Sequence, residues 1–412
     1  MSSKPDATIS HRFIRTLMIL LLYILVLIMT TGCWDRKEIN DLAFVMGAAI
    51  DQKSEGQMEL SVQVFIPKAE GGGSASLGGT ASSKGAAQEQ TMVISAEGVS
   101  IADAMSHLQE RLPREVFWGH NEVYIFGQAR AQQGIREDVD FMLRSSEPRE
   151  RANVFISKGL GKETLQLTPP LERNSSEVLR EISKFHTGLQ VTIKELAEML
   201  TGDANAAALP YIVIRPPEPD KPPNQTIAYI QGSAILKDGK MVGKLDSQAA
   251  RGILWLKDEL KTSVITVAPS HSKGSVSLRM IRSYTQLLPS IVNGVWHMDV
   301  HIETEEDVQQ NTTGISLMEP DWVKTIELSV DKLIENRAKR ALQPAQERFH
   351  SDIFGFADAF HRKYPKAWKT AKANWSDIFS RMEVRIVSRS HIVRPGISNP
   401  DATSPEKGVD SQ

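Results

Sequence analysis

The 412-residue sequence contains a single cysteine, Cys33, so no disulfide can form within the chain. An exported protein of this length without disulfides depends on the burial of apolar side chains for its stability. An excess of charge of one sign is also missing, because 48 Lys and Arg nearly balance 50 Asp and Glu. A mildly acidic chain without a long basic run lacks the electrostatic footprint of a nucleic-acid-binding protein. The composition therefore argues against a disulfide-stapled scaffold and against nucleic acid as a partner.

A long hydrophobic run is absent as well. A helix needs roughly 20 apolar residues to span a bilayer, whereas the run from Leu17 to Met29 contains thirteen. Arg12 and Arg15 precede this run, and Thr31 and Gly32 follow it. A basic start, a short apolar stretch and small residues before a cut are typical of an export signal.

The position of Cys33 directly after this segment indicates a bacterial lipoprotein signal over residues 1–32. Cleavage would make Cys33 the new N-terminus, with a diacylglyceryl group on its thiol. Thr30 departs from the usual pattern, which has Leu, Val or Ile three places before the cysteine. An uncleaved signal anchor and a buried structural cysteine are the two other interpretations. Two acyl chains would hold the mature chain at the membrane, since one chain alone binds only marginally.

Proline is concentrated in the segment 215–224, which contains five prolines in ten residues. Prolines at this density cannot join a helix or the interior of a sheet, so we expect an extended linker. It separates an N-terminal α+β part, residues 33–214, from a C-terminal domain, residues 225–395, with a disordered tail over 396–412. A Gly/Ser-rich stretch, residues 70–90, is expected to be a flexible loop. Neither a Walker-type loop nor a dinucleotide fingerprint is present to bind phosphate.

Hydrophobic periodicity predicts an α+β fold in several domains, with mainly antiparallel mixed sheets flanked by helices. Residues 58–66 alternate as in a half-buried strand, joined to residues 48–51 by a turn at 53–56. Residues 99–112 have the spacing of an amphipathic helix, and a long helix from about Asp321 should end or kink at Pro344. Further helices are expected over 128–144 (two pieces), 175–186, 192–201, 247–257 and 350–362. Further strands are expected over 92–95, 122–126, 153–157, 226–236, 241–245, 262–267, 275–283, 292–303 and 383–393.

Alternating polar residues near position 300 raise the question of a metal site: His297, Asp299, His301 and Glu303 share one face of a strand. Side chains two apart on a strand are nearly 7 Å apart, so only adjacent pairs could share an ion. The sequence favours the solvated face of an amphipathic strand. The acidic run Glu303, Glu305, Glu306 and Asp307 is similarly expected to be a solvated turn, because it lacks the glycine and ligand spacing of a calcium loop.

His120, next to Asn121 and Glu122, is either a general base or a loop histidine with local partners. No Ser or Cys nucleophile motif accompanies it, which favours the second interpretation. Helical spacing assigns most of the C-terminal aromatic residues to the core, and a patch that contacts a partner or membrane is the alternative. These residues are Phe354, Phe356, Phe360, Tyr364, Trp368, Trp375 and Phe379. We therefore predict no catalytic residue, cofactor or metal, and one functional residue, the lipid attachment site Cys33.

Several motifs in order resemble the Ger(x)C family, the C subunits of bacterial spore nutrient germinant receptors. In the first half they are Gly32-Cys33-Trp34-Asp35, Glu38-Ile39-Asn40-Asp41-Leu42, Phe117-Trp118-Gly119-His120 and Ile125-Phe126-Gly127. In the second half they are Gly232-Ser233-Ala234-Ile235, Val242-Gly243-Lys244-Leu245, Asp352-Ile353-Phe354-Gly355-Phe356 and Tyr364-Pro365-Lys366-Ala367-Trp368. Ala357, where the family pattern has glycine, and Pro344, within the long helix, depart from it.

The resemblance implies a non-enzymatic lipoprotein on the outer face of the cell membrane. In a spore, this membrane is the one called the inner membrane. The resemblance also implies two membrane-embedded partners, an A-type and a B-type subunit, in a complex that senses nutrients and releases the spore from dormancy. It assigns no binding residue beyond Cys33. A solute-binding lipoprotein of a transporter is the alternative function, and a cell-surface hydrolase is a third. The former class has two α/β lobes with parallel sheets, and the predicted hairpins and single Pro-rich linker argue against it.

Overall fold

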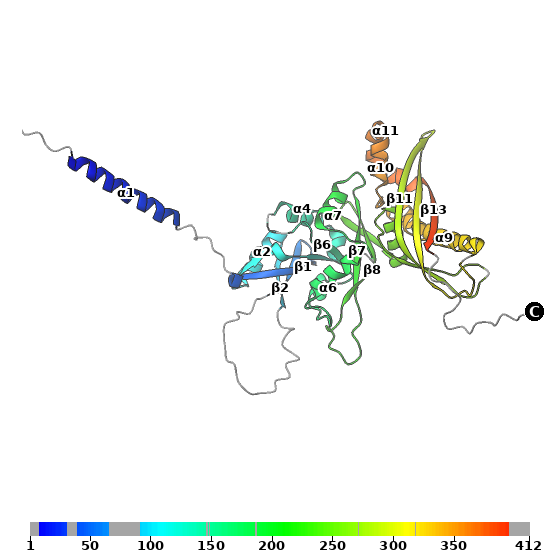
Figure 1. Ribbon diagram of the computed structural model, residues 1–412, viewed down its shortest axis with the longest axis horizontal. Coiled ribbons are helices and arrows are strands. Elements are labelled where there is room, and N and C mark those ends of the chain that lie inside the picture. The colour runs from blue at the N-terminus through cyan, green and yellow to red at the C-terminus, as the bar shows by residue number, and fades with distance from the viewer. Residues whose placement is uncertain are drawn as a thin grey trace, which may run out of the picture.

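The computed structural model describes residues 8–30, 39–65, 91–145, 147, 149–185, 188–270, 272–317 and 319–394. Residues 39–394 of this set form two domains, each built on one β-sheet with flanking helices (Figure 1). The mixed α and β composition expected from the sequence is confirmed. The predictions for Cys33, for the loop 70–90 and for the tail 396–412 lie outside the described residues.

A helix, α1 (Thr8–Thr30), contains the apolar run of the expected signal. Within the described part of the chain, no helix is long and apolar enough to cross a membrane. The first element after the undescribed residues 31–38 is a short 3₁₀ helix, Ile39–Asp41, which leads directly into the first strand.

The first sheet has nine strands, in the order β3-β2-β1-β5-β6-β7-β8-β9, with β4 beside β1. The strands are β1 (Leu42–Ser54), β2 (Gln57–Phe65), β3 (Thr91–Gly98), β4 (Glu115–Phe117), β5 (Val123–Gly127), β6 (Asn153–Ser157), β7 (Ala206–Ile214), β8 (Ala228–Lys237) and β9 (Lys240–Asp246). Its centre, β1-β5-β6-β7, is parallel and its outer pairs are antiparallel. The parallel centre was not expected from the sequence. The parallel arrangement agrees with the burial of β5 and β6, two short strands that are almost entirely buried, as strands of parallel sheets usually are.

Helices cover both faces of this sheet. On one face lie α2 (Ile101–Glu110), α4 (Arg136–Arg144) and α7 (Ile193–Thr201), and on the other lie α5 (Gly161–Leu165) and α6 (Ser175–Lys184). A further helix, α3 (Gln128–Gln133), packs beside β1 and β9. Helix α7 begins with a capping box between Thr192 and Glu195, and the N-cap of α6 is Asn174.

The predicted hairpin at the start of the domain is confirmed as β1 and β2, with Gly56 in the turn at φ +75°. However, β2 is buried on both faces and not half-buried. Its polar residues Ser61 and Gln63 are 0% and 2% exposed, because α5 and α6 cover the face that a solvated strand would leave open. The alternation of polar and apolar residues therefore distinguished the two faces of β2, but it did not show that helices cover the polar face as well.

The Pro-rich segment is not a linker between the two sheets, so that prediction is wrong. It connects β7 to β8, which are antiparallel neighbours in the first sheet, with Ile214 paired to Ala228. At the base of the connection, the Arg215 N–H donates to the Ile227 carbonyl at 2.9 Å, and the Thr226 hydroxyl donates to the Arg215 carbonyl at 2.8 Å. The chain leaves the first sheet only after β9, at helix α8 (Ser247–Leu256).

The second sheet has four strands in the order β10-β11-β12-β13, namely β10 (Val264–Val267), β11 (Val276–Val292), β12 (Val295–Asn311) and β13 (Glu383–Arg394). Its buried face packs on α9 (Pro320–Pro344), a 25-residue helix that ends at Pro344 as predicted. A π-helical turn, Ala345–Phe349, follows. The remaining helices are α10 (Phe356–Lys363), α11 (Pro365–Ala371) and α12 (Trp375–Arg381).

The C-terminal aromatic residues form core, as predicted. Phe354, Phe356, Phe360, Trp368, Trp375 and Phe379 are each at most 4% exposed. The Asp352 carboxylate lies among them and accepts hydrogen bonds from the Phe356 and Ala357 N–H groups and from Trp375 Nε1. These bonds join the start of α10 to the start of α12, so the Asp352 carboxylate organises this core.

The two domains are joined by core and by polar contacts. One cluster of buried residues runs from Ala206 and Ile235 in the first sheet to Val300 in the second. Lys237 Nζ donates to the Ser376 hydroxyl at 2.7 Å, and Lys372 Nζ lies 3.3 Å from Asp203 Oδ1. The connection between the sheets is therefore a packed interface and not an extended tether.

Candidate functional site

A cavity of about 410 Å³ opens at the end of the first sheet where the chain enters the fold, next to Ile39. Apolar side chains of β1 and β2 form one part of its lining: Phe44, Met46 and Phe65. His120 and residues from α6 and the segment before it form the charged part: Arg173, Asn174, Glu177 and Arg180. The cavity therefore combines an apolar surface with a wall that carries charges of both signs.

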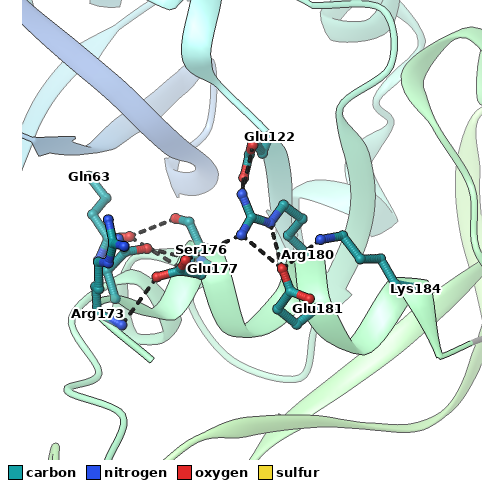
Figure 2. A network of polar contacts seen from close by, with 9 residues as sticks. Gln63, Glu122, Arg173, Ser176, Glu177, Arg180, Glu181 and Lys184 are labelled. Atoms are coloured by element: carbon teal, nitrogen blue, oxygen red, sulfur yellow. Dashed lines mark hydrogen bonds and ion pairs between the residues drawn. The ribbon is translucent and has the colours of Figure 1, made fainter. Parts of the chain in front are cut away.

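Arg180 is the centre of the charged wall (Figure 2). Its Nη1 donates to both carboxylate oxygens of Glu122, at 3.0 and 2.9 Å, and its Nη2 donates to Glu177 at 3.2 Å. Its Nε donates to Glu181 at 3.0 Å, and Lys184 donates to the same Glu181 oxygen at 2.7 Å. Burial lowers the pKa of Arg180, but the bonds to Glu122 and Glu181 outweigh it and raise that pKa. The guanidinium is thus a fixed cation that joins α6 to the residue before β5.

The start of α6 is fixed to β2 by the buried amide of Gln63 (Figure 2). The Gln63 carbonyl oxygen accepts from the Ser176 hydroxyl at 2.6 Å and from the Ser176 N–H at 3.2 Å. Its amide nitrogen donates to the Leu165 carbonyl at 2.8 Å. A Cβ atom on Gly47 would lie 2.1 Å from the Ser176 hydroxyl, so glycine lets α6 approach β1 this closely. These contacts hold Arg180 and Glu177 at the cavity wall.

His120 lies at the cavity as the last residue of the 3₁₀ helix Trp118–His120. Its ring centroid is 5.3 Å from that of Phe44 and 5.8 Å from that of Phe117. Within the described chain its ring has no hydrogen bond or ion pair, so its packing partners are aromatic. The two residues that follow His120 in the sequence do not interact with its ring: Asn121 is fully buried, and Glu122 pairs with Arg180. This arrangement offers charged and apolar contacts to a ligand and no assembled acid–base pair around His120.

Two family models match the chain in succession. The spore germination protein N-terminal domain matches residues 35–214, and the spore germination B3/GerAC-like C-terminal domain matches residues 231–396. The chain belongs to the GerAC/GerBC-like family of spore germination proteins, the C subunits of germinant receptors. The gap between the two matched ranges falls on the Pro-rich connection and the start of β8. The family division thus lies inside the first sheet and not between the two sheets.

Individual family members agree in length. The putative spore germination protein YfkR of Bacillus subtilis is 26% identical over 374 residues, which cover 91% of this chain and 95% of the relative. Spore germination protein KC of the same organism is 23% identical, with 94% and 97% covered. The crystal structure of the GerBC protein has a TM-score of 0.55 and 16% identity, covering 87% of this chain and all of that one. At this identity the GerBC likeness shows that the fold is shared.

The remaining candidate residues of this spore germination chain lie on β12. The buried side chains there include Met298, Val300 and Ile302, whereas His301 and Glu303 are exposed, as predicted for an amphipathic strand. No group of three or more metal-ligating side chains occurs among the described residues. His297 instead lies 3.1 Å from the exposed carboxylate of Glu383.

The acidic run after Glu303 is not a solvated turn, so this prediction is wrong. It continues β12, and Glu306 and Asp307 are 0% and 7% exposed. Burial raises the pKa of Glu306 to about 7, and the carboxylates of Asp331 and Glu327 add to the effect. Neither carboxyl oxygen of Glu306 has a hydrogen-bond partner within the described chain. The burial of Glu306 was not predicted, because it depends on the packing of the distant helix α9 and has no signal in the local sequence.

Proposed function

We propose that this chain is a membrane-anchored lipoprotein subunit of a spore nutrient germinant receptor, held on the outer face of the membrane by lipid on Cys33. It acts without catalysis, beside an A-type and a B-type membrane subunit. The observation that carries this proposal is the succession of two germination-protein models over residues 35–214 and 231–396. The chain also covers most of its relatives, which are named as spore germination proteins.

The sequence before the first match supports the anchored arrangement. Cys33 stands two residues before residue 35, where the first family model begins, and directly after the signal-like segment. Only five residues separate Cys33 from Ile39, the start of the first described element of the first domain. A lipid on Cys33 would therefore hold the first sheet, and the cavity beside Ile39, near the membrane surface.

The charged wall supports a binding role over an enzymatic one. At the cavity, Arg180 is already paired with Glu122 and Glu177, and His120 packs against the rings of Phe44 and Phe117. Such a set can orient a small molecule or a protein segment, but it supplies no activated nucleophile.

Replacement of Cys33 tests the anchoring part of the proposal. We expect C33A to leave the precursor unprocessed or to release the chain from spore membranes, because the thiol that would carry the lipid is gone. Membrane fractionation and the intact mass of the protein measure both outcomes, and Ser145→Ala, at the C-cap of α4, serves as the control. Germination of the C33A spores in response to nutrient should be slowed. An unchanged membrane fraction together with an unchanged processed mass would contradict lipid attachment at Cys33.

A further inference from the structure

The second domain contains a basic groove that the cavity described above does not include. It runs along α9 from Ser329 to Gln343, and its other wall is formed by the end of β10, Thr266 to Ala268, and by Gln248 at the start of α8. Its volume is about 730 Å³. Since β10 is a terminal strand of its sheet, the groove lies at a sheet edge.

The lining of the groove is one-sided in charge. It contains Lys332, Arg337, Lys339 and Arg340, and no acidic residue. Lys339 pairs with Glu335 and Arg340 pairs with Asp246, whereas Lys332 and Arg337 have no ion pair within the described chain. This cationic stripe stands out on a chain whose formal net charge is −2. Such a concentration of one sign attracts a ligand of the opposite sign.

The side chain of Arg337 has no ion-pair partner among the described residues of the groove, and its surroundings are unusual for a charged group. Its Nη1 is buried and has no hydrogen-bond partner within the described residues, while its guanidinium lies 5.7 Å from the centre of the Trp255 ring. Burial, and then the nearby charge of Arg251, lower the pKa of Arg337. Arg337 as a whole lines the groove and is only partly buried, so an incoming carboxylate can pair with the part of this side chain that faces the groove.

We propose that this basic groove docks an extended acidic segment of a partner protein, with carboxylates placed against Lys332, Arg337 and Arg340. The distance from Ser329 to Gln343 is about 21 Å along a helix axis, which an extended segment of about seven residues spans. A groove of this length is better matched by a row of carboxylates than by a single compact anion.

Peptide binding to the full chain in detergent micelles tests the proposal. The probe is a fluorescein-labelled peptide of about seven residues, alternating Glu and Thr, and the matched control peptide has Gln in place of Glu. Fluorescence anisotropy should show binding of the acidic peptide that weakens with added salt, and much weaker binding of the Gln peptide. Equal affinity for the two peptides would overturn the proposal.

Charge reversal in the groove locates the binding site. The double variant Lys332→Glu and Lys339→Glu should weaken binding of the acidic peptide by roughly tenfold, since both side chains are exposed and reversal adds repulsion. The matched control, Lys366→Glu with Lys369→Glu on α11, changes the net charge equally on exposed residues outside the groove and should bind as wild type.

Two results would contradict the groove as the site. Equal loss in the two double variants would show that net charge alone drives binding. Displacement of the peptide by inorganic phosphate, but not by sodium chloride of equal ionic strength, would assign the groove to small anions instead. Circular dichroism of each variant establishes that the fold is intact before binding is compared.

Discussion

In each sheet, one terminal strand receives hydrogen bonds from a helix, and the two helices supply opposite partners, donors in one sheet and acceptors in the other. At the edge of the first sheet, α2 supplies donors to the carbonyls of β3: His107 Nδ1 donates to the Glu97 carbonyl at 2.8 Å, and Arg111 donates to the Ser95 carbonyl. At the edge of the second sheet, α9 supplies acceptors to the N–H groups of β13. Ser388, Ser390 and Ile392 donate to Glu335, Asp331 and Glu327 at 3.3, 2.7 and 3.1 Å, respectively.

The difference lies in burial. A terminal strand exposes unpaired N–H and C=O groups, which natural proteins cover to prevent pairing with other chains. His107 and Arg111 do so from solvent, whereas Glu327 is only 7% exposed and the Asp331 carboxylate is desolvated enough to raise its pKa. The acceptors of the second sheet, Glu327, Asp331 and Glu335, follow one another at four-residue intervals along one side of α9. The basic groove lies on another side of the same helix. We therefore expect the stability that the α9–β13 contacts contribute to depend far more on substitution and on pH than that of the exposed α2–β3 contacts.

The largest expected effect comes from Glu306, which lies beneath the acidic flank of α9. Burial raises its pKa from 4.5 to about 7, so the folded state binds a proton that the unfolded state has released. Stability should thus decrease as pH rises from about 4.5 to 7, by up to about 3 kcal/mol. In E306Q this dependence should largely disappear, and the variant should be more stable than wild type at pH 8. Urea unfolding across this pH range measures both, with exposed Glu303→Gln as the control. An unchanged slope in E306Q would contradict the assignment.

The next effect comes from Asp331, which accepts from both the N–H and the hydroxyl of Ser390, at 2.7 and 2.8 Å. Asp331→Ala leaves the Ser390 N–H without its acceptor and the Ser390 hydroxyl with only the Thr304 hydroxyl at 3.2 Å, and we expect a loss of about 2 kcal/mol in the free energy of unfolding. Lys332→Ala, the exposed neighbour on α9, should be nearly neutral. Urea titration of both variants gives the comparison, and similar small losses in both would mean that the β13 edge needs no acceptor from α9.

The smallest effect should come from His107. The hydrogen bond to the Glu97 carbonyl, followed by the charge of Asp103, raises the pKa of this exposed ring. A raised histidine pKa contributes stability below the unfolded value of 6.5, which is lost as pH rises through the folded pKa. H107A should therefore lose this dependence and change stability much less than Asp331→Ala. NMR titration of the imidazole measures its pKa directly, and a value at or below 6.5 would refute the edge contact.

The sequence predicted what depends on local patterns. The β1–β2 hairpin, the helix at 101–110 and the end of α9 at Pro344 all have short-range signals, and all are confirmed. The parallel neighbours β5 and β6 have no such signal, because nothing in two short apolar runs states which strands they will join. The density of prolines identified an exposed connection at 215–224 but not that its two ends pair in one sheet.

The candidate site was less predictable than the fold. The sequence singled out His120 and Glu122, but Arg180 pairs with Glu122 across 58 positions, and this contact has no local signature. Glu306 was misplaced for a related reason, since an acidic residue in a polar run is normally solvated and only α9 encloses it. One of the two sequence arguments against a solute-binding lipoprotein is lost, because the Pro-rich segment does not link two lobes, and the parallel centre of the first sheet weakens the other, although the hairpins are confirmed. Family membership now carries that distinction.

We propose that this spore germination protein works as a lipid-anchored receptor subunit. Affinity purification of the tagged full chain from detergent-solubilised spore inner membranes, with mass spectrometry of the co-purifying proteins, tests it most directly. We predict recovery of an A-type and a B-type receptor subunit in wild type, with a sharp reduction in C33A. Recovery of a transporter permease in their place would contradict the account and favour solute capture.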